Sequence, residues 1–152
     1  MLQKPEPKKM RLGDVLDPVP LDAACWSEMG YLKDKAVRDA AEGKGFAMQI
    51  VTPESDKVGT IGKGYAKNRS TEPKCQHPEN PNLLRLLTPA EHARVKGINE
   101  ELVKGLSATI AHELLGQSIL PAPFKAAWSY LGECLLRWAS REERPRELLL
   151  AA

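Results

Sequence analysis

The sequence predicts an α+β fold in which a small β-rich region is followed by C-terminal helices. Apolar residues alternate in the stretch FAMQIV at 46–51, which is typical of a strand with one buried face. A helix-capping signal begins at Thr88, and an apolar stripe with helical spacing runs through the last part of the chain. Together these patterns place the strands before the helices.

The composition fits one domain, or one domain and a small part, since the chain has 152 residues. Hydrophobic residues make up 42% of the sequence, which is enough for a core, although aromatic residues make up only 5%. The formal net charge of +2 is nearly neutral and gives no global argument for nucleic-acid binding. A DNA-binding face must therefore come from local clustering of positive charge.

The cysteine and histidine positions argue against a metal site. Cys25, Cys75 and Cys134 form no CxxC pair, and His92 and His112 have no second ligand at i+4. An odd cysteine count without a secretory signal predicts a reducing compartment. The basic N-terminus lacks the apolar segment of a signal peptide, and no apolar run approaches the ~18 residues of a membrane helix. We therefore expect a cytoplasmic protein without a membrane segment.

The first forty residues predict a lead-in, an extended segment and a helix. Residues 1–11 are basic and proline-rich and are expected to be disordered. Residues 12–20 contain prolines, each of which disfavours helix in the residue before it. Residues 26–42 place apolar side chains near a 3.6-residue period, with Ser27 as the candidate N-cap and Gly43 as the breaker.

A β-hairpin and a long loop are predicted next. Residues 46–51 form the first strand, 52–56 a turn and 57–61 the returning strand. Residues 62–82 predict a long loop, which in a small domain is either functional or disordered. Five cations against two acidic residues leave a charge of +3 over residues 56–77. A solvated, partly disordered loop is the alternative interpretation.

The helix after this loop has strong local signals at both ends. Thr88 suits the N-cap, Pro89 suits the first helical position, and Glu91 can return a hydrogen bond to the Thr88 backbone N–H. Gly97 can supply the left-handed residue that ends the helix near Lys96.

Two short helical segments are expected after this helix. Asn99 caps a turn over residues 100–104. A further helix begins at Ser107 or the next residue, and runs to Leu115, where Gly116 ends it.

The final predicted helix opens at Pro121 or Pro123 and runs to Ser140. The tail after it, residues 141–152, is expected to fray because it contains a proline. The apolar stripe of this helix consists of Phe124, Ala127, Trp128, Leu131, Leu135 and Trp138.

Residues 85–97 resemble the ninth motif of the DNA (cytosine-5) methyltransferases. That motif reads Arg-x-Leu-Thr-Pro-x-Glu-x-x-Arg-Leu-Gln-Gly-Phe-Pro, and this chain shares its Arg, first Leu, Thr, first Pro, Glu, second Arg and Gly. The chain departs from the motif at Val95, Lys96, Ile98 and Asn99.

Other segments resemble the same family in the same order. Residues 12–16 are similar to the entry into the target-recognition region, and residues 43–46 to the first recognition loop. Thr60 and Ile61, before the next glycine loop, are similar to the second recognition loop. Residues 116–119 resemble the tenth motif, Gly-Asn-Ser/Ala-Val, with Gln in place of the usual Asn.

The resemblance implies a division of the chain into four parts: a lead-in at 1–11, a target-recognition region at 12–84, a C-terminal helical segment with the two motif-like stretches at 85–140, and a tail at 141–152. The residues implied to contact DNA are Lys44, Gly45, Thr60, Ile61, Lys63, Tyr65, Lys67 and Arg69. Those implied to contact the cofactor are Gln117 and Ser118. The structural motif is implied to consist of Arg85, Thr88, Pro89, Glu91, Arg94 and Gly97.

Several residues in these segments also have a simpler interpretation. Thr60 fits an ordinary strand position, and Phe46 fits the core because it starts the alternating pattern. Gln117 and Ser118 fit a helix-stop loop, and Glu91 has its capping role.

The chain lacks the residues that would perform the chemistry. Cytosine-5 methylation requires a cysteine thiolate that adds to the flipped base, and in the family this cysteine follows a proline. None of the three cysteines here follows a proline, and the Glu-Asn-Val and Phe-x-Gly-x-Gly motifs are missing. The chain is therefore not expected to catalyse methyl transfer alone.

The predicted function is the DNA-recognition part of a cytosine-5 methyltransferase of a restriction-modification system, as a fragment or as the small subunit of a split enzyme. The expected partners are double-stranded DNA and a catalytic large subunit, or a second copy bound through the last helix. S-adenosyl-L-methionine would bind only when a catalytic partner completes the site. The alternatives are a free-standing, non-catalytic DNA-binding or regulatory module and a decayed remnant.

Overall fold

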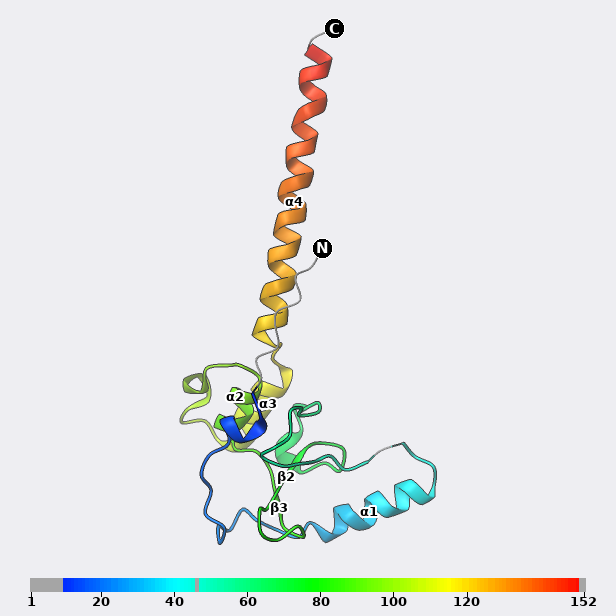
Figure 1. The fold of residues 1–152 in the computed structure, drawn as a ribbon, viewed down its shortest axis with the longest axis vertical. Coiled ribbons are helices and arrows are strands. Elements are labelled where there is room, and N and C mark those ends of the chain that lie inside the picture. The colour runs from blue at the N-terminus through cyan, green and yellow to red at the C-terminus, as the bar shows by residue number, and fades with distance from the viewer. Residues whose placement is uncertain (1–9, 46, 151–152) are drawn as a thin grey trace. The chain divides into compact units, whose positions relative to one another are not determined.

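The computed structural model describes residues 10–45 and 47–150, with side chains up to residue 140 (Figure 1). The chain divides into two compact units, one comprising Lys8–Ser118 and the other containing the stretch from Ile119 onward. The predicted lead-in falls almost wholly outside the described residues, as does Phe46. None of the helices in the described part combines the length and apolar character that crossing a bilayer requires.

The predicted α+β class is confirmed, with a small mixed sheet of three short strands in the first unit. The strands are β1 (Ile50–Val51), β2 (Lys74–Gln76) and β3 (Leu84–Arg85), in the order β1-β2-β3. β1 runs parallel to β2, with Val51 opposite Cys75. β2 runs antiparallel to β3, with Cys75 opposite Arg85.

The predicted hairpin is therefore wrong. Residues 57–61 form no strand, and β1 instead pairs with β2, which lies inside the predicted loop. The sequence Lys-Cys-Gln of β2 has no alternating apolar pattern, so periodicity could not identify it. The connection from β1 to β2 has the length that a parallel pair needs, because a dozen or more residues must cross between parallel strands.

The helix predicted over residues 26–42 is shorter than expected. α1 spans Gly30–Ala41, and its N-cap is Met29 in a left-handed conformation with φ of 48°. Ser27 is not the cap, because its backbone pairs with Leu84 of β3. The Ser27 N–H donates to the Leu84 carbonyl at 3.0 Å, and the Leu84 N–H donates to the Ser27 carbonyl at 2.8 Å. Trp26 consequently lies outside the helix, and its indole Nε1 donates to the Pro20 carbonyl at 2.9 Å.

The C-terminal helices begin at the predicted caps, but α3 continues through the predicted stop at Gly116 to Gln117. The Thr88 side chain accepts from the Glu91 N–H, the reciprocal bond of the capping box is present, and Gly97 has a φ of +67°. Asn99 and Ser107 cap the next two elements with their side chains. The elements are η1 (Leu12–Val15), η2 (Tyr65–Lys67), α2 (Pro89–Val95), η3 (Glu100–Val103), α3 (Ala108–Gln117) and α4 (Pro121–Leu150). α4 thus runs past the predicted end at Ser140.

Two small hydrophobic clusters form the core of the first unit. The larger cluster brings the sheet together with η1 and η2, and consists of Leu12, Val51, Ile61, Tyr65, Cys75 and Leu87. The smaller one joins α2, η3 and α3, and consists of Ala93, Val103, Ala111 and Leu115.

A buried histidine pair joins α2 to α3. The Nδ1 atoms of His92 and His112 are 3.0 Å apart, and the rings stack with centroids 5.3 Å apart. The Tyr65 ring meets both imidazoles edge-on. One Nδ1 must donate and the other accept, so at least one ring is neutral at that nitrogen. Burial lowers the pKa of His92 to about 4, helped by the proximity of His112 and Lys96, and burial also lowers the pKa of His112.

We predict that acid destabilises the first unit before its carboxylates protonate. A depressed histidine pKa means that the unfolded chain binds more protons below its usual pKa, so the free energy of unfolding decreases as pH falls through 6.5 toward 4. Between about pH 7 and 5, the titration of His92 alone should lower the free energy of unfolding by about 2 kcal/mol. Urea denaturation followed by circular dichroism measures this loss. A His92→Leu/His112→Leu double variant with the same pH dependence over that range would contradict the assignment.

Candidate nucleic-acid interface

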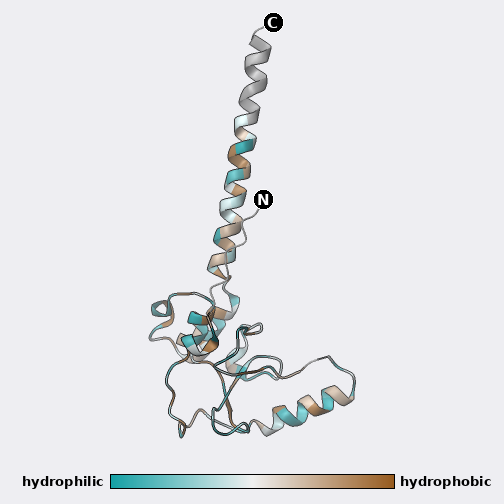
Figure 2. Cartoon of the chain, viewed as in Figure 1, coloured by the Kyte–Doolittle hydropathy of each residue, from teal (hydrophilic) through white to brown (hydrophobic). Residues whose placement is uncertain are grey.

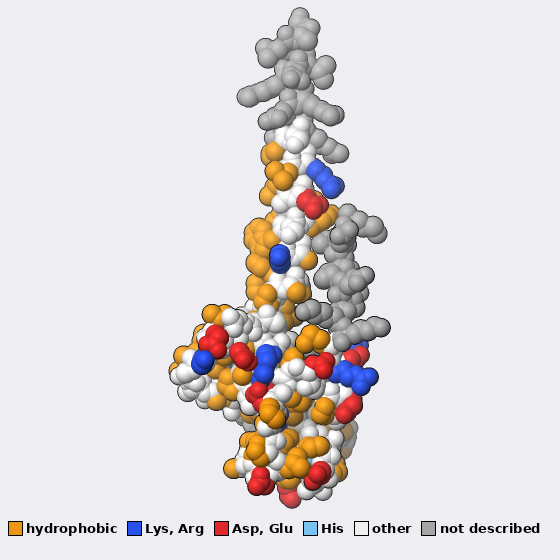
Figure 3. All heavy atoms as spheres, turned by 60° about the vertical axis from the view of Figure 1, so that its left-hand side comes forward, with side chains coloured by type: hydrophobic (Ala, Val, Ile, Leu, Met, Phe, Trp, Pro, Cys, Tyr) orange, Lys and Arg blue, Asp and Glu red, His pale blue; other side chains and the backbone are white. Residues whose placement is uncertain are grey.

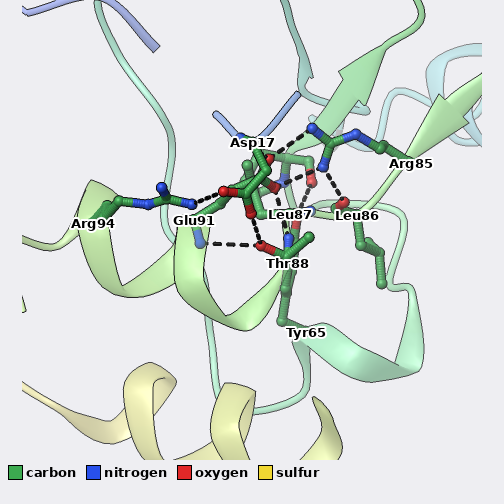
Figure 4. Close-up of polar contacts among 9 residues, drawn as sticks. Asp17, Tyr65, Arg85, Leu86, Leu87, Thr88, Glu91 and Arg94 are labelled. Carbon is green, nitrogen blue, oxygen red and sulfur yellow. Dashed lines mark hydrogen bonds and ion pairs between the residues drawn. The ribbon is translucent and has the colours of Figure 1, made fainter. Parts of the chain in front are cut away.

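The side chain of Glu91 lies at the centre of a buried polar network (Figure 4). Its carboxylate accepts hydrogen bonds from both terminal nitrogens of Arg85, at 2.6 and 2.8 Å. The backbone N–H groups of Thr88 and Asp17 donate to the same carboxylate at 2.7 and 2.8 Å. Four donors therefore compensate for removing this charge from water.

Asp17 extends the network to the N-terminal part of the unit. Its carboxylate is paired with Arg94 and accepts from the Thr88 hydroxyl at 3.0 Å. Burial acts to raise the pKa of Asp17, but hydrogen bonds from Arg94 and Thr88 outweigh it and lower the pKa overall. No local signal in the sequence predicts this role of Asp17, because its partners lie more than seventy residues away in the chain. Arg94 also approaches Glu100, with Nε and Oε2 3.3 Å apart.

A second polar framework closes a loop over residues 62–72, which we call the 62–72 loop. The Gly62 N–H donates to the Glu72 carboxylate at 3.1 Å, which ties the two ends of the loop together. The Lys74 ammonium donates to the carbonyls of Arg69 and Glu72 at 2.8 and 3.1 Å. The loop is thus held from beneath by β2.

Two buried side chains connect this loop to the core. The Tyr65 hydroxyl donates to the Pro73 carbonyl at 2.8 Å and accepts from the Leu87 N–H at 2.9 Å. The Lys74 side chain has no exposed surface, and its ammonium lies 5.7 Å from the centre of the Tyr65 ring. Burial lowers the pKa of Lys74 to about 8.

The cations of the 62–72 loop point outward while its tyrosine points inward. Lys63, Lys67 and Arg69 are exposed, and Thr60 is exposed just before the loop. Tyr65 and Ile61, which the resemblance implied as DNA contacts, instead lie in the core. A side chain with little or no exposed surface cannot reach a DNA backbone, so packing explains these two residues.

α3 packs directly against the start of the loop. A side-chain carbon at Gly116 would lie 2.3 Å from the Lys63 backbone nitrogen and 2.4 Å from the Gly62 carbonyl carbon. Only glycine allows this approach. Gly116 therefore touches the 62–72 loop, which the resemblance implies as a DNA contact. The next two residues, Gln117 and Ser118, are those implied to contact the cofactor.

The two residues implied to contact the cofactor end α3. The Ser118 hydroxyl donates to the Leu115 carbonyl at 2.7 Å, and the exposed Gln117 side chain reaches back toward Glu113 at 3.5 Å. The Lys96 ammonium donates to the carbonyls of Leu115 and Ser118. This cation sits at the negative end of the helix dipole, which favours it.

Among the described residues, the first glycine turn makes no hydrogen bond or ion pair with the 62–72 loop. It follows α1, whose Lys35 ammonium donates to the Ser70 hydroxyl of that loop at 3.4 Å. The Lys44 ammonium pairs with Glu42 at 2.5 Å and approaches Asp39 at 3.9 Å. In the face shown in Figure 3, cationic and acidic side chains are intermixed over the first unit, so positive charge there is local rather than broad.

A cavity of about 330 Å³ lies beside the network, lined in part by Trp26, Cys75, Gln76 and Arg85. The Arg85 guanidinium carbon lies 5.2 Å from the centre of the Trp26 ring. Burial raises the pKa of the Cys75 thiol to about 12. The thiol is therefore protonated at neutral pH and is a poor nucleophile. The described residues contain no group of three or more His, Cys, Asp or Glu that could hold a metal ion.

Comparison with known proteins identifies methyltransferases as relatives. The type II methyltransferase M.SsoII of Shigella sonnei is 32% identical over 116 residues, which cover 73% of this chain and 29% of that protein. The type II methyltransferase M1.ScrFI of Lactococcus lactis subsp. cremoris is 30% identical over 122 residues, covering 77% of this chain and 30% of that protein. No protein-family model matches the sequence.

Solved methyltransferase structures share the fold. The Dnmt2 methyltransferase of S. pombe aligns with a TM-score of 0.64 and 21% identity, over 88% of this chain and 43% of that chain. The methyltransferase EhMeth of Entamoeba histolytica aligns with a TM-score of 0.63 and 19% identity, over 89% of this chain and 44% of that chain. Most of this chain is thus distantly homologous to DNA methyltransferases, and it spans about three tenths of the length of the curated relatives.

We predict that Glu91→Gln destabilises the first unit by about 3 kcal/mol or more, because it leaves the buried Arg85 guanidinium without its counter-charge. Urea denaturation at neutral pH measures the change. The matched control is Glu101→Gln, which makes the same chemical change in an exposed ion pair with Lys104 and should cost less than about 1 kcal/mol. Equal losses in the two variants would show that the buried network does not hold the fold.

Proposed function

From this homology, we propose that the chain is the DNA-recognition part of a DNA cytosine-5 methyltransferase, either as a fragment or as the small subunit of a split enzyme. The observation that carries the proposal is the 62–72 loop. Its backbone is fixed from below by Lys74 and Tyr65, while Lys63, Lys67 and Arg69 remain exposed on it. A rigid loop that presents cations can position a protein on DNA phosphates with little ordering cost on binding.

The local pattern of charge supports this role better than the overall charge does. The net charge of the whole chain is only +2, so binding must depend on a few phosphate contacts. Such binding is modest and strongly dependent on salt, because each contact releases condensed counterions from the DNA. Gly64 is buried and the Arg69 guanidinium lies against it, so the part of the loop that supports this proposal is its exposed cations rather than its glycine backbone.

We predict that Lys67→Gln lowers the salt dependence of binding to double-stranded DNA. Loss of one phosphate contact should reduce the slope of log affinity against log salt by about 0.9. Fluorescence anisotropy with a pool of short labelled duplexes, titrated between about 50 and 200 mM salt, measures the slope.

The control for this experiment is Lys104→Gln. It removes the same charge from an exposed position directly after η3, where the ammonium pairs with Glu101 at 3.0 Å. This variant should leave the slope unchanged. If both variants change the slope equally, the chain binds DNA only through its overall charge, and the 62–72 loop is not the interface.

The catalytic part of the reaction is proposed to lie outside this chain. In the methylation of C5, a thiolate must attack the base and a bound S-adenosyl-L-methionine must supply the methyl group. Cys75 is buried with a raised pKa and faces the sheet core, and no cysteine here follows a proline. The remaining length of the relatives would supply the nucleophile and the main cofactor contacts.

We predict that the purified chain incorporates no radiolabelled methyl group into DNA from S-adenosyl-L-methionine. A polypeptide that carries the Pro-Cys and Glu-Asn-Val motifs should regain activity on mixing if the two are halves of a split enzyme. Methyl incorporation by the chain alone would refute the proposed division of labour.

A free-standing DNA-binding module is the second candidate. It is favoured by the observation that Lys8–Ser118 forms a compact unit with its own two hydrophobic clusters. The mixing experiment separates the two functions. A free module binds DNA tightly alone and gains nothing from a catalytic polypeptide, whereas a split-enzyme subunit gains activity.

A further inference from the structure

α4 carries a concentration of exposed apolar side chains. Of the eighteen large hydrophobic residues that are exposed in the described part of the chain, nine lie between residues 119 and 138. Trp128 and Trp138 are more than half exposed, at 56% and 59%. Figure 3 shows the hydrophobic atoms as a band along the described part of this helix. An apolar surface of this kind marks an interaction site.

The spacing of this band is that of a coiled-coil seam. Its positions alternate in steps of three and four residues, as the a and d positions of a heptad do. The seam consists of Pro121, Phe124, Trp128, Leu131, Leu135 and Trp138.

The residues beside the seam allow a second helix to approach closely. Four of the flanking positions hold small residues: Ala127, Gly132, Cys134 and Ala139. Glu133 and Arg137 lie off the seam and approach each other within the helix at 3.6 Å. Neither charge therefore has to be buried when the seam is covered.

We propose that the seam binds α4 of a second copy of this chain, with the two helices antiparallel. In an antiparallel pair an a position faces a d position. With the two-fold axis between Trp128 and Leu131, Phe124 faces Leu135 and Trp128 faces Leu131. Trp138 faces Pro121 at each end of the seam. Every aromatic side chain thus meets a smaller residue, which lets the layers interdigitate.

The parallel arrangement packs less well. It would place Phe124, Trp128 and Trp138 each opposite its own copy, so three of the six layers would hold two large aromatic side chains. In the antiparallel register, Lys125 of one helix also lies near Gly132 of the other, where no side chain obstructs the lysine stem.

The exposed area is sufficient for a specific pair. Aromatic side chains offer on the order of 200 Å² each, and those of the seam are roughly half exposed. With the two leucines, the pair of helices would bury roughly 1,000 Å², which is near the lower limit for a biological interface. We therefore expect a dimer that dissociates on dilution rather than an obligate one.

Sedimentation velocity of the full chain over a range of micromolar concentrations tests the association. The wild-type chain should be dimeric at the higher concentrations, and Leu131→Glu should raise the dissociation constant by roughly 100-fold, because the new carboxylate would be buried in both central layers. The matched control is Leu136→Glu, because Leu136 is 71% exposed and lies off the seam. Circular dichroism checks that both variants keep their helix.

A monomeric wild-type chain at all concentrations would overturn the proposal, including the case in which a different protein uses this face. Equal weakening by the two glutamate substitutions would overturn the assignment of the seam.

A cysteine cross-link tests the orientation. In the antiparallel register, residue 127 of one helix lies within about one turn of Cys134 of the other, on the same side of the seam. Ala127→Cys should therefore form a disulfide-linked dimer under mild oxidation. In a parallel pair the two positions are about two turns apart and cannot be bridged. Ser129→Cys, on the outer face, is the control, and equal cross-linking of both variants would overturn the antiparallel arrangement.

Discussion

The buried Glu91 carboxylate is the constraint on which the first unit depends. A fully buried charge is tolerated only when its hydrogen-bonding capacity is met, and here the donors come from three separate segments. The N-terminal stretch supplies the Asp17 N–H, β3 supplies the Arg85 guanidinium, and the start of α2 supplies the Thr88 N–H. Displacing any one of these segments would leave part of the hydrogen-bonding capacity of the buried carboxylate unmet, which favours a single arrangement of the three. The structural role of this motif requires no contact with DNA or cofactor.

The Glu91 network is also connected to the 62–72 loop, through the backbone that follows Arg85. The Leu87 N–H donates to the Tyr65 hydroxyl, which donates in turn to the Pro73 carbonyl next to Lys74. The Lys74 ammonium then holds the carbonyls of Arg69 and Glu72. The loop is therefore fixed by neutral and charged hydrogen bonds on its inner side. Its exposed cations, Lys63, Lys67 and Arg69, are not needed to hold the loop in place. This division explains why a long, polar segment of sequence can be ordered without an extended sheet.

Local signals in the sequence predicted the helix caps from Thr88 onward, but not the start of α1 or the ends of α3 and α4. They carried no information on non-local strand pairing. The capping box at Thr88, the left-handed Gly97 and the caps at Asn99 and Ser107 each depend on residues within four positions, so a single sequence contains them. β2 pairs with residues from opposite sides of it in the chain and includes a buried lysine, which no hydrophobic pattern predicts. Within the candidate site, the exposure of Lys63, Lys67 and Arg69 followed from their charge. The buried position of Tyr65 did not follow, because its environment is made by Leu87, Pro73 and the two histidines of α2 and α3.

One departure from the family motif has a structural use in this chain. Where the motif has Gln, Lys96 places its ammonium on the carbonyls of Leu115 and Ser118, at the C-terminal end of α3. The same end of α3 carries Gly116, whose lack of a side chain lets the helix lie against the backbone of Gly62 and Lys63. Lys96, which follows α2, therefore helps to hold the C-terminal end of α3, and this end of α3 packs against the start of the 62–72 loop. The Lys96 side chain thus has two hydrogen-bond partners at a position where the sequence departs from the motif, so the fold accommodates this departure.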